Sequence, residues 1–390
     1  MNLMWGNAIR IARIHGFEIK VDASWLLIAA LIVWSLATAY FPVEFPDART
    51  PALLVMAVAA MLGLFGSLIV HELAHAIVAR RFGLRISGIT LFLFGGVAEL
   101  QSEPVSGATE FWIAIAGPFA SFCLALGFWF SALVSDIIGL PAAALSIFGY
   151  LAVINLVLAL FNLLPAFPMD GGRVLRAWLW TRSGDLVMST RHAVTVSNVI
   201  AYGVIALGLY AVFSGALAAG LWPILIGLFL LATSRASLAR LETEVAFDGR
   251  TVATFMTRDP WTARVDQSLS DLVNNVFMEH AITFAPVLED GTLLGYVDTQ
   301  IVRKIDREHW TTVMVEDVIE NVNNDNSVSC DMTGLDLMAR IMKTGRRKFL
   351  VVDAEGLAGV ITLTDVLAVI NVSREVGPAP HHSYSRTAPE

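Results

Sequence analysis

The sequence is poor in charged residues and in cysteine, and both shortages restrict what the protein can be. Only 15% of its 390 residues are charged while 56% are hydrophobic, and the mean hydropathy is +0.66. A soluble protein of this length needs a more polar surface, so most of the chain is expected to lie in a membrane. One cysteine, Cys123, falls in an apolar run and the other, Cys330, in a polar region, which excludes a disulfide framework.

The few charges are unevenly divided along the chain. Residues 1–240 hold 13 Lys and Arg against 11 Asp and Glu, whereas the remaining 150 residues hold 13 against 23. The acidic excess therefore belongs to the C-terminal part, which argues against a nucleic-acid partner. The first 20 residues mix charges with short apolar runs, so no removable signal peptide is expected.

Six apolar runs have about the length needed to cross the hydrocarbon core of a bilayer. Of the 13 basic residues before position 241, only Arg49 falls in a loop on the outer side of this arrangement. Because Lys and Arg accumulate in cytosolic loops, both termini and the acidic C-terminal part are predicted to be cytosolic, in a multi-pass protein of the cell (inner) membrane. The six runs cover residues 23–40, 52–79, 108–134, 141–165, 193–213 and 217–234.

The second run carries a cluster of ionisable residues. His71, Glu72 and His75 form the sequence His-Glu-Leu-Ala-His within the apolar stretch 51–79. Ionisable side chains are costly in hydrocarbon and mark functional sites. On a helix the two histidines project from one face with the glutamate beside them, an arrangement in which imidazoles bind zinc and a carboxylate takes a proton from water. The motif therefore predicts a metal-dependent hydrolase within the membrane.

A catalytic zinc site uses three protein ligands, so the two histidines need a third. Asp170 is the best candidate because it matches them in depth. His71 follows Pro51 by 20 residues, or about 30 Å of helix, so the histidines are expected near the inner edge of the hydrocarbon. Asp170 follows a span that runs in the same direction. Pro165 and Pro168 are expected to break the helix before Asp170 and to leave its carboxylate on irregular backbone that lines a water-containing cavity.

Residues 86–100, between the second and third spans, are too short and too rich in glycine to cross the membrane. Their β-branched and aromatic side chains predict one or two strands at the membrane interface, with an ordinary loop as the alternative. Residues 89–94 are the predicted free edge to which an extended substrate could add.

The polar C-terminal part contains an internal repeat. Residues 246–372 read as two βαβ-like units about 64 residues apart, in which a helical stretch is followed by strand, turn and strand. We therefore predict a membrane domain at 1–240, two soluble domains at 246–305 and 312–372, and a disordered tail at 373–390.

Three motifs of the membrane half resemble those of the site-two protease family of intramembrane zinc metalloproteases. They are the His-Glu-Leu-Ala-His sequence, a Gly-Pro pair at 117–118, and Asn-Leu-Leu-Pro-Ala-Phe-Pro-Met-Asp-Gly at 162–171. The resemblance covers roughly residues 10–240 and departs from many relatives at Ser121, where they have asparagine. It implies cleavage of transmembrane segments, with His71, His75 and Asp170 as zinc ligands, Glu72 as the catalytic base and Asn162 positioning the substrate or the oxyanion.

The second soluble repeat ends in Gly-Val-Ile-Thr-Leu-Thr-Asp at 359–365, which resembles the strand-to-helix signature of cystathionine-β-synthase (CBS) domains. This resemblance implies a pair of modules that binds an adenine nucleotide, with Thr362 and Asp365 at the ribose and phosphate. The first repeat has Asp298 and Ile301 at the matching positions and so lacks both residues. The alternative for the pair is a ligand-free platform for homodimer formation.

Together these features predict a polytopic α-helical membrane domain of about six transmembrane helices with a short membrane-associated β segment, followed by a cytosolic α/β CBS-domain pair. The predicted function is an intramembrane zinc endopeptidase that cleaves a membrane-tethered regulator with a single transmembrane segment, under control of an adenine nucleotide. The alternative is a CBS-regulated transporter or channel without protease activity. Transport would favour polar residues along a pathway, whereas here they concentrate at one level.

Overall fold

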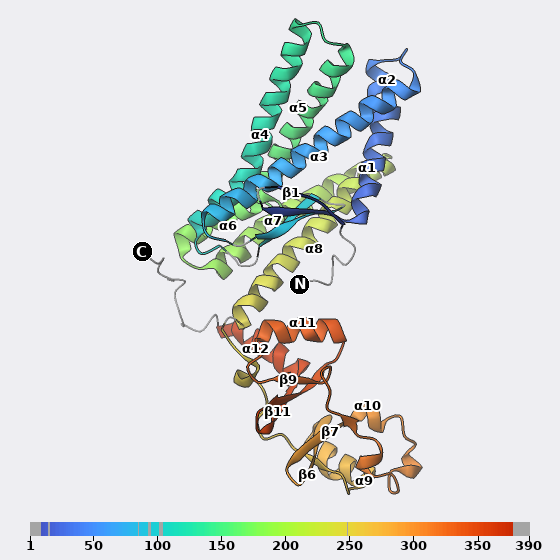
Figure 1. Ribbon diagram of the computed structural model, residues 1–390, viewed down its shortest axis with the longest axis vertical. Helices are drawn as coiled ribbons and strands as arrows, with labels where there is room; N and C mark the ends of the chain where they lie inside the picture. The colour runs from blue at the N-terminus through green and yellow to red at the C-terminus, as the bar shows by residue number, and fades with distance from the viewer. Residues whose placement is uncertain are drawn as a thin grey trace. The chain divides into compact units, whose positions relative to one another are not determined.

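The computed structural model describes residues 9–14, 16–84, 86–92, 95–100, 104–247 and 249–376. The chain divides between Ala239 and Arg240 into two compact units, which are described separately (Figure 1).

Among the described residues of the first unit, six helical segments are long and apolar enough to cross a membrane, and they confirm the six predicted spans. The first, Ala23–Glu44, joins α1 (Ala23–Ser35), a π-helical turn (Leu36–Tyr40) and α2 (Phe41–Glu44). The others are α3 (Thr50–Arg81), α4 (Gly107–Ile137), α5 (Ala142–Asn162), α7 (Leu186–Phe213) and α8 (Leu217–Phe247). The last two exceed the predicted spans most, because each continues into polar sequence at one end.

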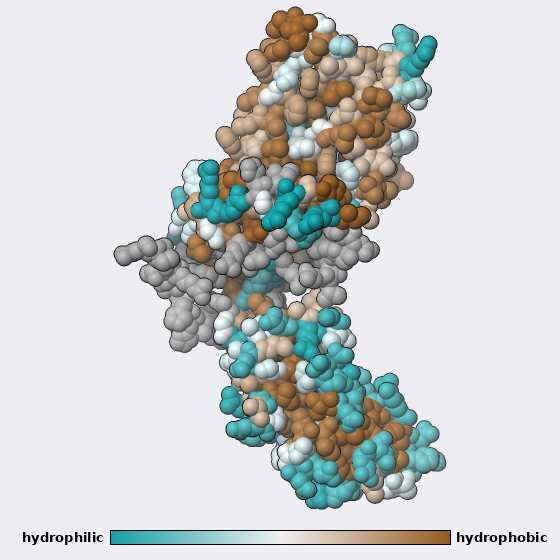
Figure 2. Space-filling model, in the orientation of Figure 1, coloured by the Kyte–Doolittle hydropathy of each residue, from teal (hydrophilic) through white to brown (hydrophobic). Residues whose placement is uncertain are grey.

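The surface of this unit is apolar. Large side chains such as Trp129, Phe213 and Trp222 are more than half exposed, and the visible face over α3, α4 and α5 is mostly hydrophobic (Figure 2). In water such a surface would aggregate, so these side chains face lipid.

A four-stranded sheet lies beside the helices in the order β1-β2-β3-β4. Parallel pairing joins β2 to β3, while the β1–β2 and β3–β4 pairs are antiparallel. The predicted strands between the second and third spans are therefore present, but the prediction that residues 89–94 form a free edge is wrong, since β3 is paired on both sides. Residues 93–94 lie outside the described residues. The strands are β1 (Ile9–Ile14), β2 (Phe17–Val21), β3 (Ile86–Phe92) and β4 (Gly95–Leu100).

The N-terminal hairpin that covers β3 was not predicted. Its second strand alternates buried Phe17, Ile19 and Val21 with partly exposed Glu18 and Lys20, as expected of a strand with one face packed on a core. The buried face packs against Leu73 and Ala76 of α3, so that the free edges among the described strands are those of β1 and β4.

The second unit contains two sheets, ordered β5-β6-β7-β8 and β11-β10-β9, with a short helix after each hairpin. Each sheet contains an antiparallel hairpin, β6–β7 in the first and β10–β11 in the second. The strands are β5 (Ala263–Arg264), β6 (Phe284–Glu289), β7 (Thr292–Asp298), β8 (Glu320–Asn321), β9 (Ser327–Ser329), β10 (Lys348–Asp353) and β11 (Gly356–Thr362). The helices are α9 (Leu269–Asp271), continued by a π-helical segment (Leu272–Met278), α10 (Thr299–Val302), α11 (Gly334–Thr344) and α12 (Leu363–Val376).

The two repeats exchange their leading segments. Phe247 and Val252 pack in the core of the second repeat. There the backbone N–H of Thr257 donates to the carbonyl of Val360, and the N–H of Val360 donates to the carbonyl of Thr257. Val315, near the start of the second repeat in sequence, packs in the core of the first. Neither core is complete without the other's segment, so the repeats form one interlocked unit. Helix α12 continues to Val376, and residues 377–390 of the predicted tail lie outside the described residues.

Candidate metal centre

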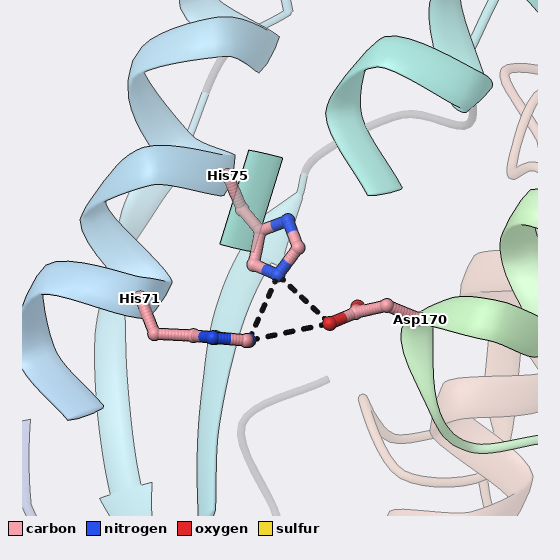
Figure 3. Close-up of side chains that lie close together, drawn as sticks. All are labelled: His71, His75 and Asp170. Carbon is pink, nitrogen blue, oxygen red and sulfur yellow. Dashed lines mark hydrogen bonds and ion pairs between the residues drawn. The ribbon is translucent and has the colours of Figure 1, made fainter. Parts of the chain in front are cut away.

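The first unit brings two histidines and an aspartate together at one point (Figure 3). One turn of α3 separates His71 from His75, and their Nε2 atoms are 3.3 Å apart. The Oδ2 atom of Asp170 lies 3.2 Å from each Nε2. Both histidines are buried, at 3% and 7% exposure. Three atoms with lone pairs that converge in a buried place form a suitable donor set for a divalent metal ion.

Hydrogen bonds from the far side of each imidazole orient these atoms. The Nδ1 of His75 lies 2.7 Å from the backbone carbonyl of Ile113, which can only accept, so Nδ1 carries the proton and Nε2 keeps its lone pair. The Nδ1 of His71 lies 2.8 Å from the hydroxyl of Ser121, which is fully buried. Such partners fix the tautomer and ring orientation of metal ligands. Ser121 therefore contacts the cluster through His71.

Helix α4 passes so close to the imidazoles that only glycine fits at one position. A Cβ atom on Gly117 would lie 2.1 Å from Nε2 of His75 and 2.6 Å from Nε2 of His71. The bare backbone leaves free the space that the three donor atoms surround. This explains the glycine of the Gly-Pro pair, whose role the sequence alone did not reveal.

Asp170 is the first residue of α6 (Asp170–Ser183), a helix that was not predicted. The irregular backbone expected at Asp170 ends at the preceding residue, so this expectation is wrong. Gly171 and Gly172 allow the helix to begin there, because Cβ atoms on them would lie within 2.3 to 2.7 Å of the backbone of residues 163–167. The start of α6 is thereby held against the turn that leaves α5.

A buried ion pair ties α6 to α4. The Nε of Arg176 donates to both carboxylate oxygens of Glu110, at 2.8 and 3.1 Å, and Glu110 is fully buried. The Nε of Arg173 lies 3.7 Å from the same carboxylate. A paired charge in this setting resists removal of either partner. The sequence signal for this contact is Glu110 itself, the lone glutamate at the start of the third span.

Glu72 is 9% exposed and lies within electrostatic reach of both histidines, Asp170 and Arg173. Asn162 ends α5 and is half-buried, and its Nδ2 donates to Leu158 of its own helix at 3.1 Å. Asn155 instead makes the interhelical bond, from its Nδ2 to Ser67 of α3 at 3.0 Å. His71, His75 and Asp170 thus lie together with Glu72. No described contact links Asn162 to them.

In the second repeat, the two residues predicted to bind a nucleotide, Thr362 and Asp365, contact each other. The hydroxyl and the backbone N–H of Thr362 each donate to Oδ2 of Asp365 at 2.8 Å, at the start of α12. In the first repeat, Asp298 caps α10 and pairs with Lys348 of the second repeat at 3.2 Å. Close by, Arg346 bonds to both Tyr296 and Glu320, and burial together with Glu320 raises the pKa of Tyr296 to about 12.

A bundle of membrane-spanning helices that buries two histidines and an aspartate, with a glutamate beside them, defines a membrane-embedded metallopeptidase. Comparisons with known proteins agree. Residues 59–142 and 134–209 match the model of peptidase family M50, and residues 252–307 and 311–372 match the CBS domain.

Similar proteins extend the match over the whole chain. Rip3 of Mycobacterium tuberculosis, named as a zinc metalloprotease, is 36% identical over 96% of this chain and 95% of its own length. The zinc metalloprotease MJ0392 of Methanocaldococcus jannaschii is 30% identical over 79% of this chain and 84% of its own. A solved structure, the site-2 protease from the same organism, is 29% identical and covers 59% of this chain and 94% of that one, with a TM-score of 0.40.

The chain therefore belongs to peptidase family M50, the site-two proteases, and carries a C-terminal pair of CBS domains. It is a multi-pass membrane protein and a zinc metalloendopeptidase. This confirms the predicted family, fold class and enzyme class, and it disfavours the alternative of a transporter or channel.

Proposed function

We propose that His71, His75 and Asp170 hold the zinc ion and that Glu72 is the catalytic base of an endopeptidase that cuts transmembrane segments. The observation that carries this proposal is the convergence of two Nε2 atoms and one carboxylate oxygen within 3.3 Å beside Gly117. Zinc accepts a donor set of two imidazoles and one carboxylate with a further position left open. The buried Nδ1 contacts of both histidines support ligation through Nε2.

Zinc, when bound, supplies a Lewis acid that polarises the scissile carbonyl and makes water a stronger acid. Glu72 takes the proton from the attacking water and returns it to the nitrogen of the leaving amine. Asn162 has an amide that its own helix uses only in part, and we assign it to the substrate or to the developing oxyanion.

A transmembrane substrate must unwind before hydrolysis, because its backbone groups are already paired within a helix. We propose that the unwound segment adds to the free edge of β4 instead of to β3. The edge is a suitable template because its backbone groups have no described strand partner. Proline substitutions at 96 and 98 that left the cleavage site and rate unchanged would contradict strand addition.

The substrate class that fits is a membrane-tethered regulator with a single transmembrane segment. Six spans and the distribution of basic residues support cytosolic termini and cytosolic CBS domains. We propose that the CBS pair binds an adenine nucleotide at Thr362 and Asp365 and so controls proteolysis. A homodimer formed through the CBS pair is the competing role for this unit.

The proposal is tested by comparing membrane proteomes of cells that carry the wild-type protein or Glu72→Gln. Loss of the base should stop turnover while purified protein keeps about one zinc per chain. A single-span protein should then accumulate uncut in the variant. His71→Ala serves as the matched control, since it should lose both zinc and turnover. Normal cleavage by Glu72→Gln, or equal zinc content in wild type and His71→Ala, would contradict the assignment.

A further inference from the structure

A cavity of about 290 Å³ lies between α1, α3 and α5 in the membrane unit. Its walls are mainly apolar, and no charged side chain among the described residues lines it. They include Ala29 and Ile32 from α1, Leu64 and Leu68 from α3, and Ile154 and Leu158 from α5. A cavity of this kind accepts apolar groups and rejects charged ones, because nothing in its wall can replace their hydration.

Both helices that face α1 across this cavity lead to the candidate catalytic residues. On α3, Leu64, Leu68 and Glu72 follow one another at four-residue spacing and so lie on one face. On α5, Leu158 and Asn162 are related in the same way, and Asn162 donates to the carbonyl of Leu158. The α3 wall therefore ends one turn from the Glu72 carboxylate.

The two helices also keep the same level. Leu151 fills the space beside Gly63, and one turn further along each helix Asn155 bonds to Ser67. Because α3 and α5 advance together, the ends of both cavity walls reach the depth of the metal centre. The rings of Trp25 and Phe65, 4.4 Å apart, form part of the wall.

We propose that this cavity is a specificity pocket for a large apolar side chain of the substrate, one or two residues from the bond that is cut. An extended chain advances about 3.3 to 3.6 Å per residue, and one helical turn is about 5.4 Å, so the neighbouring side chains of a peptide group held at Glu72 reach the pocket. The inference rests on the proposed function. It adds that the enzyme selects bulky aliphatic or aromatic residues on the membrane side of the scissile bond.

Zinc-binding probes of graded size test this pocket. Full-length zinc-loaded protein in lipid nanodiscs is titrated with N-acyl amino-acid hydroxamates and with substituted malonyl hydroxamates, which present a side chain on opposite sides of the zinc-binding group. Each series carries methyl, isobutyl and naphthylmethyl side chains, and the readout is the dissociation constant from competition with a fluorescent hydroxamate. Comparing protein variants cancels the partition of each probe into lipid.

In one of the two series, the wild type should prefer isobutyl over methyl by about tenfold more than Ala29→Phe does, because the added ring fills the pocket. Ala30→Phe is the matched control, since Ala30 is the exposed neighbour on the same helix and should keep the wild-type preference. Ile154→Ala, which enlarges the pocket, should shift the preference toward naphthylmethyl and covers the case in which Ala29→Phe does not fold.

Equal preferences in wild type, Ala29→Phe and Ile154→Ala, in both series, would overturn the pocket and leave the cavity to lipid chains. Absence of all hydroxamate binding, the methyl compounds included, would instead overturn the proposed zinc site and the pocket with it. The two failures are therefore distinguishable.

Discussion

The metal centre in the membrane unit and the Thr362–Asp365 pair in the CBS unit were both predicted from sequence motifs, yet their side chains are arranged differently. At the metal centre, three potential ligand atoms face one another at 3.2 to 3.3 Å, and the Nδ1 atoms of the histidines point outward to Ile113 and Ser121. At the CBS pair, the donors of Thr362 point at the carboxylate of Asp365.

The difference teaches what each motif requires. The first arrangement leaves three potential ligand atoms facing one another in a buried place, a geometry that suits a metal ion. The second arrangement is satisfied in itself, because it is also a helix cap of the Ser/Thr-x-x-acid type. A nucleotide at Thr362 and Asp365 would have to compete with that cap.

The largest expected effect comes from closing the space at the metal centre. In Gly117→Ala the new methyl group would lie about where the donor atoms meet, so zinc content should fall from about one per chain to nearly none, and proteolysis should be lost. Elemental analysis of the purified protein measures this. Gly127→Ala on the same helix is the control, since nothing lies within 4 Å of a Cβ there. A zinc-replete, active Gly117→Ala protein would show that the metal binds elsewhere.

A smaller effect is expected from the outer contact of His71. Ser121→Ala leaves Nδ1 of His71 without its buried hydrogen-bond partner, which should weaken zinc binding by roughly 10- to 100-fold. Competition with a metal chelator measures the affinity, and Ser121→Thr should restore it. Ser131→Ala is the control, because that hydroxyl bonds to its own helix on the exposed side. An unchanged zinc affinity in Ser121→Ala would show that the hydrogen bond between Ser121 and His71 does not contribute to zinc binding.

The next effect concerns Asp298 of the first CBS repeat, which forms an ion pair with Lys348 of the second repeat. Lys348→Ala removes the Lys348 partner of the largely buried Asp298 carboxylate and of the Thr283 carbonyl. This loss should destabilise the unit by about 1 to 3 kcal/mol. Hydrogen exchange in residues 284–298 of the full-length protein should accelerate accordingly. The substitution of an exposed lysine, Lys304→Ala, should leave exchange unchanged. Similar exchange in both variants would show that the ion pair between Lys348 and Asp298 does not stabilise this repeat.

The smallest effect tests whether the second CBS site is a cap, a ligand site or both. Thr362→Ala should cost about 1 kcal/mol through loss of the cap and speed exchange at the start of α12. If an adenine nucleotide also binds there, AMP or ATP should protect residues 250–376 from protease in the wild type and not in this variant. Thr364→Ala, an exposed neighbour, should keep the protection. Equal protection of the wild type, Thr362→Ala and Thr364→Ala would show that the nucleotide does not bind at Thr362.

The sequence predicted the parts of the fold that depend on local pattern. Long apolar runs identify membrane spans because a bilayer demands about 20 apolar residues, and four-residue spacing places His71 and His75 on one helix face. Asp170, chosen because it matches the histidines in expected depth, lies with its carboxylate 3.2 Å from both imidazoles.

What escaped prediction depends on contacts between distant segments. The strands β1 and β2 are short, and their pairing with β3 appears only when residues 9–21 meet residues 86–92. Helix α6 starts with two glycines, which lower helix propensity and hide its beginning. The need for Gly117 arises from the approach of α4 to α3, which no single-helix pattern contains.

The Glu110–Arg176 ion pair has a consequence for how the protein is made. Glu110 leaves the ribosome well before Arg176, and a lone carboxylate is unfavourable at its fully buried position until the arginine arrives. Helix α4 therefore reaches its final packing only after α6 has been synthesised. Asp170 arrives on the same helix, so a chain whose first three spans are already inserted does not yet contain the third member of the His71–His75–Asp170 cluster.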